Sequence, residues 1–204
     1  MNTVICNGTP VTPSKVVCVG LNYVAHIREL GNEIPEDMVV FIKPNSAISN
    51  TLESSVDGEA LHYEGEIALL IRNNTFAAVG FGIDLTRREL QSKLKQKGLP
   101  WERAKAFNSA AVFSAFVPLP DNIGTLSLQL KVDDQPRQAG GVEMMTYKPA
   151  TILSELQKFT TLEDGDLVMT GTPEGVGVIN KGERFEGAVL SDNEVLVSAS
   201  WIAR

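Results

Sequence analysis

The sequence predicts an α+β fold, a strand-rich domain built on a mixed β-sheet with a few short helices. Short apolar runs rich in β-branched residues recur along the chain and end at Gly, Pro, Asn or Asp, as buried strands do. Helical patterns are fewer. They do not alternate regularly with the strands, as they would in a doubly wound fold.

The strands are predicted from these apolar runs in chain order. The run at 15–20 is bounded by Gly20 and Asn22, and the longest run, at 61–71, becomes apolar on both faces after Glu66. The turn Asp133-Asp134 follows 126–132 and predicts a hairpin. The predicted strands cover residues 15–20, 39–42, 61–71, 76–83, 126–132, 167–170, 184–189 and 195–202.

Three segments carry helical signals. Residues 23–30 predict a helix that stops at Gly31, before a polar loop at 32–37. Thr86 and Glu89 have the spacing of a capping box, which predicts a helix over 87–97. The third helix is predicted over 151–159, with an apolar stripe made by Ile152, Leu153, Leu156 and Phe159.

Composition limits the classes of partner. A chain of 204 residues suits one domain, predicted here to cover residues 1–204, and its formal charge of -7 argues against nucleic acid and against an acidic membrane surface. No apolar run approaches the roughly 20 residues of a membrane span. The first residues lack the pattern of a signal peptide, so we expect a cytoplasmic protein.

The strand at 61–71 carries two carboxylates on one face, Glu64 and Glu66, because residues two apart in a strand point the same way. Asp84 follows at the next strand-to-helix junction. Three carboxylates without a His or Cys cluster suit a hard cation, Mg²⁺ first and Mn²⁺ or Ca²⁺ next. The alternatives are a solvated strand end for the glutamates and a helix-entry residue for Asp84.

Six motifs in order resemble the fumarylacetoacetate hydrolase family. The similarity runs from about Lys15 to the end of the chain and is greatest to the short branch of acylpyruvases, fumarylpyruvate hydrolases and oxaloacetate-processing enzymes. The motifs are Asn22-Tyr23-x-x-His26-x-x-Glu29, Phe41-x-Lys43-Pro44, Tyr63-Glu64-Gly65-Glu66, Asp84-Leu85-Thr86-Arg87-Arg88-Glu89-Leu90-Gln91, Trp101-Glu102-Arg103-Ala104-Lys105-Ala106-Phe107 and Thr170-Gly171-Thr172-Pro173-Glu174-Gly175-Val176-Gly177.

The resemblance implies a fold of that family, a homodimer and a set of site residues. It implies Mg²⁺ or Mn²⁺ on Glu64, Glu66 and Asp84. His26 and Glu29 would supply the general base from a short lid-like helix. Lys105 would lie near the metal, and Thr172 in its loop would contact substrate. Asn108 departs from the family pattern, which has Asp there, so a role for this side chain is in doubt.

The residues themselves allow other interpretations of this chemistry. His26 and Glu29 share a helical face, and the carboxylate would fix the imidazole tautomer, although such a pair can also be an ordinary surface contact. Lys105 would offset the negative charge of the three carboxylates and of an anionic substrate and would stabilise an oxyanion. The alternative is an ordinary solvated lysine.

Three further features are open in the same way. Arg88 either assists at the site or pairs with solvent or a glutamate. Gly171 and the glycines after it offer backbone N–H groups, with the Thr172 hydroxyl, to a substrate carboxylate, or they form a plain turn. His62 is taken as a wall residue on the glutamate face.

The predicted function is Mg²⁺-dependent hydrolysis of a C–C bond in an acylpyruvate-type 1,3-diketo acid, through an enolate that the metal stabilises. The substrate would be a small anionic keto acid such as fumarylpyruvate or acetylpyruvate. The same site also serves oxaloacetate tautomerisation or decarboxylation, or isomerisation of an unsaturated dicarboxylate, and these reactions are the alternative. A non-catalytic metal-binding domain is the second alternative.

Overall fold

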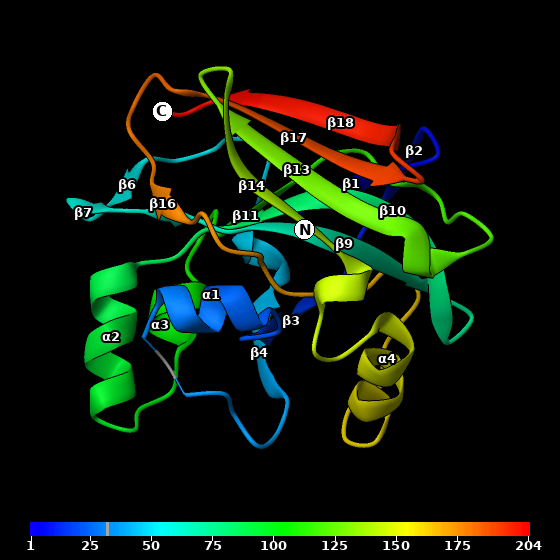
Figure 1. Cartoon of the computed structure of the whole chain (residues 1–204), viewed down its shortest axis with the longest axis horizontal. Coiled ribbons are helices and arrows are strands. Elements are labelled where there is room, and N and C mark those ends of the chain that lie inside the picture. The colour runs from blue at the N-terminus through cyan, green and yellow to red at the C-terminus, as the bar shows by residue number, and fades with distance from the viewer. Residues whose placement is uncertain (32) are drawn as a thin grey trace.

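The computed structural model describes residues 1–31 and 33–204, and it consists of two packed β-sheets with short helices at their margin (Figure 1). Strands greatly outnumber helices, and the larger sheet mixes parallel and antiparallel pairs. The predicted strand-rich α+β class is therefore confirmed.

The larger sheet has the strand order β4-β3-β15-β9-β10-β11-β5, with β12 also paired to β10. Its centre is the long antiparallel pair of β9 and β10, which brings residues 65–72 against 75–83. The strands of this sheet are β3 (Lys15–Gly20), β4 (Val39–Pro44), β5 (Ile48–Ser49), β9 (Gly65–Arg72), β10 (Thr75–Asp84), β11 (Ala111–Phe113), β12 (Val117–Pro118) and β15 (Leu167–Met169).

The second sheet is antiparallel, with the order β14-β13-β17-β18, and it lies across one face of the first (Figure 1). Its strands are β13 (Leu126–Val132), β14 (Gln135–Gly141), β17 (Arg184–Ser191) and β18 (Glu194–Ile202). Three small antiparallel pairs complete the strands: β1 (Val4–Cys6) with β2 (Thr9–Val11), β6 (Ser55–Val56) with β7 (Glu59–Ala60), and β8 (His62–Tyr63) with β16 (Gly177–Val178).

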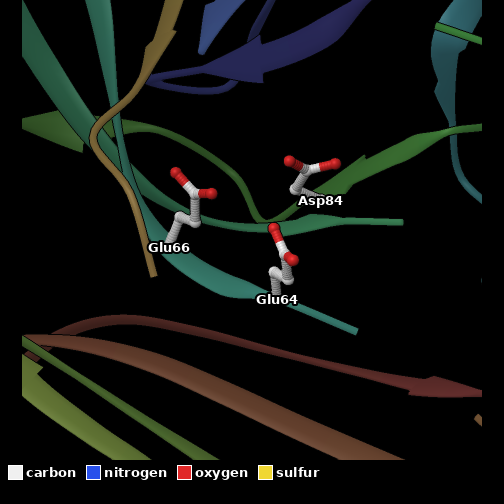
Figure 2. Close-up of side chains that lie close together, drawn as sticks. All are labelled: Glu64, Glu66 and Asp84. Atoms are coloured by element: carbon white, nitrogen blue, oxygen red, sulfur yellow. The ribbon is translucent and has the colours of Figure 1, made fainter. Parts of the chain in front are cut away.

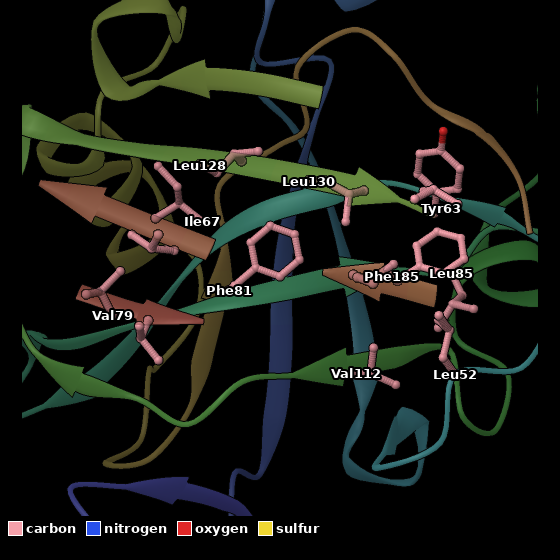
Figure 3. Packing of buried hydrophobic residues seen from close by; sticks show 14 of the residues in the cluster. Leu52, Tyr63, Ile67, Val79, Phe81, Leu85, Val112, Leu128, Leu130 and Phe185 are labelled. Atoms are coloured by element: carbon pink, nitrogen blue, oxygen red, sulfur yellow. The ribbon is translucent and has the colours of Figure 1, made fainter. Parts of the chain in front are cut away.

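The main core fills the space between the two sheets. Ile67 and Leu69 of β9 point into it, and Phe81 of β10 lies at its middle (Figure 3). A Cβ atom on Gly187 of β17 would lie 2.1 Å from the Phe81 ring, so glycine at this position allows the second sheet to approach the aromatic side chain.

The larger sheet also buries side chains away from the main core, because successive side chains of a strand point to opposite faces of the sheet. Ala68 and Leu70 of β9 pack in a second cluster with Cys18 and Met169. Helix α4 (Pro149–Gln157) packs against β3 and β15 through a third cluster that contains Ile152 and Leu156. Central strands buried on both faces explain the continuous apolar runs in the sequence.

Three helices lie together at the end of the larger sheet: α1 (Val24–Glu29), α2 (Arg88–Gln96) and the four-residue α3 (Glu102–Lys105) (Figure 1). Helices α1 and α2 match the predicted segments, and Gly31 and Gly98 adopt the left-handed conformation of helix stops. The predicted loop at 32–37 begins at Asn32, which lies outside the described residues. Helix α3 was missed because four residues are too short to show a period.

The predicted capping box at Thr86 is wrong. The Thr86 hydroxyl accepts a hydrogen bond from Lys105 Nζ (2.6 Å), and the Thr86 backbone pairs with His62. Within the described residues, the N–H of Leu90 in the first turn of α2 is instead capped by Glu59 Oε1 of β7, at 3.2 Å. The Thr86 hydroxyl therefore binds the buried Lys105, and not the helix N-terminus that the sequence pattern predicted.

The predicted apolar stripe of the third helix is wrong at one end. Ile152 and Leu156 are fully buried, but Phe159 lies beyond the end of α4 and is 61% exposed. The helix also begins two residues earlier than predicted, with Pro149 in its first turn, where a missing N–H costs nothing. No helix of the described residues is long and apolar enough to cross a membrane.

Candidate metal centre and base

Three carboxylates meet where β9 and β10 begin to separate. Glu66 pairs with Gly82 across the two strands, and the Asp84 N–H donates to the Glu64 carbonyl at 2.8 Å, which places all three residues at one end of the sheet. Each offers an oxygen within 4.8 Å of the other two, and the side chains converge on one space (Figure 2). All three are buried, so the alternative of a solvated strand end is wrong.

Cationic side chains contact these carboxylates. Lys105 Nζ donates to Glu64 Oε2 and to Asp84 Oδ2, both at 2.7 Å, and Arg88 Nη2 donates to Glu64 Oε1. Lys43 Nζ, which is completely buried, lies 2.8 Å from Asp84 Oδ1. Burial is tolerable for both lysines because each has carboxylate and oxygen partners.

Asp84 Oδ1 is in an unusual position. The Lys43 ammonium donates hydrogen bonds to the carbonyl oxygens of Lys105, Ala110 and Leu85. Asp84 Oδ1 has an ion pair with Lys43 but no hydrogen bond of regular geometry from any described residue. A buried acceptor in this state has a lone pair available for another ligand.

The three carboxyl groups also differ in their pKa values. Burial alone would raise the pKa of Glu64, but Lys105 and Arg88 outweigh it and hold this pKa well below its usual range. Glu66 is different, because burial and the neighbouring Asp84 and Glu64 charges together raise its pKa well above the ordinary value. Burial would lower the pKa of Lys105, whereas Asp84 and Glu64 raise it above normal.

These observations fit a hard divalent cation. The donors are all carboxylate oxygens, one of them lacks a hydrogen bond, and one carboxyl group is disfavoured as an anion by its neighbours. A divalent ion among them would remove the repulsion that Glu66 experiences. Glu64, Glu66 and Asp84 are therefore the residues that would hold it.

His26 and Glu29 of α1 form a hydrogen-bonded pair, with His26 Nδ1 3.0 Å from Glu29 Oε2. His26 is buried, so the alternative that this pair is an ordinary surface contact is wrong. The second oxygen of Glu29 accepts the Gly175 N–H at 2.9 Å. A carboxylate on Nδ1 leaves Nε2 as the ring nitrogen that can exchange a proton with a molecule in the pocket.

The glycine-rich loop after β15 supports the carboxylates from behind. The Gly171 N–H donates to Glu66 Oε2 at 2.6 Å, and the Thr172 hydroxyl donates to the Gly65 carbonyl at 2.9 Å. Both hydrogens are thus used within the protein. The loop is a built part of the site and not a plain turn, although its donors are committed to protein atoms.

Seven of the nine predicted site residues line a single pocket: His26, Glu64, Glu66, Asp84, Arg88, Lys105 and Thr172. The other two, Glu29 and Gly171, lie one hydrogen bond behind His26 and Glu66. Phe41, Gln91 and Trp101 complete other parts of the wall.

Two residues considered from the sequence lie elsewhere. His62 lines a separate surface groove beside Arg87, and burial followed by the Arg88 charge lowers its pKa. Its assignment as a wall residue of the carboxylate pocket is wrong, because the predicted strand is interrupted at Glu64, and β8, which carries His62, belongs to a different sheet from β9. Asn108 is exposed and does not line the pocket.

Two buried residues of the site had no assigned role in the sequence interpretation. Lys43 stands in the Phe41-x-Lys43-Pro44 motif, and its position directly after the predicted strand at 39–42 was the signal that could have identified it. Gln138 contacts both Gly65 and Thr172. It had no comparable signal, because β14 is rich in polar residues.

The fold and this site define a class of protein, an enzyme in which a cluster of buried carboxylates suited to a divalent metal and a histidine–glutamate pair meet at one pocket. The comparisons with known proteins identify the family. Residues 15–200 match the family described as fumarylacetoacetate (FAA) hydrolase, C-terminal. The chain belongs to the fumarylacetoacetate hydrolase family, as its motifs suggested.

The most similar relatives include two named oxaloacetate tautomerases. The chain is 39% identical to YcgM of Escherichia coli, across 87% of this chain and 91% of that protein. It is 36% identical to mitochondrial FAHD1 of Arabidopsis thaliana, across 89% of each. A solved fumarylpyruvate hydrolase from Pseudomonas aeruginosa, in complex with Mn²⁺ and pyruvate, superposes with a TM-score of 0.85 at 31% identity, covering 100% of this chain and 96% of that one.

Proposed function

We propose that this enzyme is an oxaloacetate tautomerase that interconverts the enol and keto forms of oxaloacetate. The observation that carries the proposal is the His26–Glu29 pair facing the same pocket as the buried carboxylates. Near-full-length relatives named as tautomerases favour this reaction over the C–C hydrolysis that led the sequence interpretation.

The metal would be held by Glu64, Glu66 and Asp84, and we propose Mg²⁺ or Mn²⁺. A divalent ion supplies Lewis acidity that stabilises the negative charge of an enolate oxygen. The Mn²⁺ in the fumarylpyruvate hydrolase structure of Pseudomonas aeruginosa supports a divalent ion of this kind.

The charges around the pocket favour a dianionic substrate. Lys43, Lys105 and Arg88 contact Glu64 and Asp84. With the Glu66 carboxylate beside them these six groups sum to zero, and a divalent ion would bring the sum to two positive charges. Oxaloacetate carries two negative charges at neutral pH and acetylpyruvate only one. The dicarboxylate is therefore the better electrostatic match.

The proton transfer is assigned to His26. Its Nε2 removes a proton from C3 of the keto form and delivers it to the oxygen on C2, and the reverse sequence restores the ketone. No water is consumed and no redox change occurs. Glu29 orients the imidazole and stabilises its protonated form, since its carboxylate binds Nδ1.

The remaining residues are given binding roles. Lys105 and Arg88 offer positive charge to the substrate oxygens from the pocket wall. Gly171 and Thr172 hold the Glu64–Glu66 segment through Glu66 Oε2 and the Gly65 carbonyl. Thr172 also lines the pocket, where its hydroxyl oxygen can accept a hydrogen bond from the substrate.

Hydrolysis of fumarylpyruvate is the second candidate. It is favoured by the Pseudomonas aeruginosa relative and by a base that could equally activate water. Decarboxylation of oxaloacetate would use the same site. The homodimer and the cytoplasmic location remain proposals.

The test is to add oxaloacetate as its enol and to follow the loss of enol absorbance, with Mg²⁺ and with EDTA. Malate dehydrogenase with NADH would report the keto form, and lactate dehydrogenase with NADH would report pyruvate. Fumarylpyruvate and acetylpyruvate are run in parallel. The His26→Ala variant serves as the control, because it should keep metal binding and lose roughly 10²–10⁴-fold in rate.

Metal-dependent ketonisation without pyruvate supports the tautomerase. Pyruvate from oxaloacetate would point to a decarboxylase, and cleavage of fumarylpyruvate with unchanged oxaloacetate would establish the hydrolase. An unchanged rate for His26→Ala would show that His26 is not the base, whichever substrate is used.

A further inference from the structure

Gln138 joins the two segments that build the site. It lies on β14, in the second sheet, and is only 3% exposed. Its Oε1 accepts the Gly65 N–H, and its Nε2 donates to Thr172 Oγ1 and to the Pro173 carbonyl, all at 2.8 Å. One amide therefore links the strand of the metal ligands to the glycine-rich loop.

A bulge in β14 aims this side chain. Leu130 pairs with Gln138, while Lys131 pairs with Pro136, which leaves Arg137 as the extra residue. Bulges of this kind redirect side chains next to active sites. The Arg137 carbonyl would lie 2.0 Å from a Cβ atom on Gly175, whose φ is +96°, so only glycine allows the loop to pass here.

The two segments that Gln138 joins carry different functional groups, the proposed metal ligands on one side and the contacts to the proposed base on the other. Gly65 stands between Glu64 and Glu66, two of the proposed metal ligands. On the loop side, the Gly171 N–H binds Glu66, and the Gly175 N–H binds Glu29 of the base pair. The position of the loop therefore sets how far the base lies from the carboxylates.

Gln138 does not line the pocket itself. Its effect on the reaction must pass through the groups that it holds. If its amide is removed, the Gly65 N–H and the Pro173 carbonyl lose a buried partner, and the loop loses its link to β14. Gly171 and Thr172 still bind β9, so the expected result is a shift of the loop and not its release. Misplacement of reacting groups by about 1 Å is enough to reduce a rate by about 10²-fold.

We propose that Gln138 is a positioning residue of this enzyme, which fixes the distance between the carboxylate metal centre and the His26–Glu29 base. The proposal rests on the proposed function for its kinetic consequence. Its consequence for metal binding does not depend on which substrate the enzyme uses.

The test compares Gln138→Met with Asn45→Leu. Asn45 is a matched control, because its buried amide also accepts one backbone N–H, from Asn2, and donates to two carbonyls, of Asn2 and Pro13. Both variants remove three hydrogen bonds of a buried side-chain amide, one accepted and two donated. Each is examined for its urea midpoint, its Mn²⁺ affinity and Mn²⁺ EPR spectrum, and its kcat and KM with oxaloacetate.

We expect Gln138→Met to lower kcat by roughly 10–100-fold, to weaken Mn²⁺ binding about tenfold and to change the EPR spectrum, with little change in KM. Asn45→Leu should lose stability but keep the wild-type kcat, Mn²⁺ affinity and spectrum. If Gln138→Met loses only stability, as the control does, the residue is merely structural and the proposal is overturned.

Gln138→Glu decides the matter if the methionine variant does not fold. Its carboxylate still accepts the Gly65 N–H but cannot donate to Thr172 or Pro173, so Mn²⁺ should still bind while kcat falls at least about tenfold. A wild-type kcat would overturn the proposal. If the wild type does not act on oxaloacetate, the proposed function fails, and the Mn²⁺ affinity and spectrum of Gln138→Met alone decide the role of Gln138.

Discussion

Glu29 uses its two carboxylate oxygens for different partners, His26 Nδ1 and the Gly175 N–H. We predict that Glu29→Gln keeps the contact to Gly175 through its amide oxygen and presents an NH₂ group to the imidazole. That group requires a hydrogen-free Nδ1, so the proton moves to Nε2 and the base is blocked. The expected result is a kcat about 10²–10⁴-fold lower with unchanged Mn²⁺ affinity.

The control for this prediction is Glu36→Gln, which makes the same change in charge at an exposed glutamate. It should leave kcat at the wild-type value. A Glu29→Gln enzyme with normal kcat would show that the tautomer of His26 does not limit the reaction.

Lys43 is a second single-residue prediction. Lys43→Met leaves Asp84 Oδ1 without its cation and removes the buried hydrogen bonds that the ammonium donates to the carbonyls of Lys105 and Ala110. Breaking a buried ion pair on one side costs about 3–5 kcal/mol, so the free energy of unfolding should fall by about that amount. Urea unfolding measures it.

Lys93→Met on the exposed face of α2 is the matched control, since Lys93 lies 4.0 Å from Glu89 in solvent. We expect a change within about 0.5 kcal/mol. Equal midpoints for the two variants would mean that the buried ammonium of Lys43 is replaceable by a methionine side chain, contrary to the prediction.

At the scale of elements, Asp166 joins β15 to the start of β3. Its oxygens accept hydrogen bonds from Ser14 N (2.9 Å), Lys15 N (3.1 Å) and Glu163 N (2.9 Å), and Lys15 Nζ lies 2.5 Å away. Burial would raise the pKa of Asp166, but these contacts hold it below its ordinary value. A depressed carboxyl pKa stabilises the fold above the unfolded pKa, and the effect is lost as the pH falls through the folded value.

We therefore predict that Asp166→Asn lowers the free energy of unfolding by about 2 kcal/mol at pH 7, and that the difference from wild type shrinks once the pH falls below about 5. Urea midpoints at several pH values measure it. Asp164→Asn is the control, because its carboxylate accepts only an exposed N–H, from Asn73, among the described residues. A difference that grew on acidification would contradict the prediction.

The elements show what sequence patterns can reveal. The run at 15–20 became strand β3, because a strand that is buried on both faces is apolar over nearly its whole length. The capping box at Thr86 failed because its hydroxyl had a tertiary partner in Lys105. A local rule cannot account for a partner that comes from a different segment of the chain.

The same reason limits the prediction of the site over the whole molecule. The carboxylate spacing and the His26-x-x-Glu29 spacing are local, so the sequence could indicate both. Lys43 and Gln138 act on residues more than 30 positions away. The Lys43 contacts form only when the larger sheet is assembled, and those of Gln138 only when the second sheet packs on it. The prediction that residues 1–204 form a single domain remains a prediction.

For the whole molecule, we predict that Mn²⁺ or Mg²⁺ raises the thermal midpoint and that EDTA reverses the rise. A ligand that binds only the native state stabilises it by about 2.7 kcal/mol at 100 times its Kd. In a chain of this size that corresponds to a shift of about 5–10 °C in Tm. Calorimetry across a metal titration measures the shift.

Glu66→Gln gives this prediction its sharpest form. Without metal, burial and the Asp84 and Glu64 charges raise the pKa of Glu66, so the anion is a cost to the fold. The neutral amide removes that cost and can still accept the Gly171 N–H. We therefore expect Glu66→Gln to be at least as stable as wild type in EDTA, yet to lose the metal-induced rise in Tm.

The exposed control Glu194→Gln should keep the full rise. If Glu66→Gln is stabilised by metal as strongly as the wild type is, then Glu66 is not a ligand.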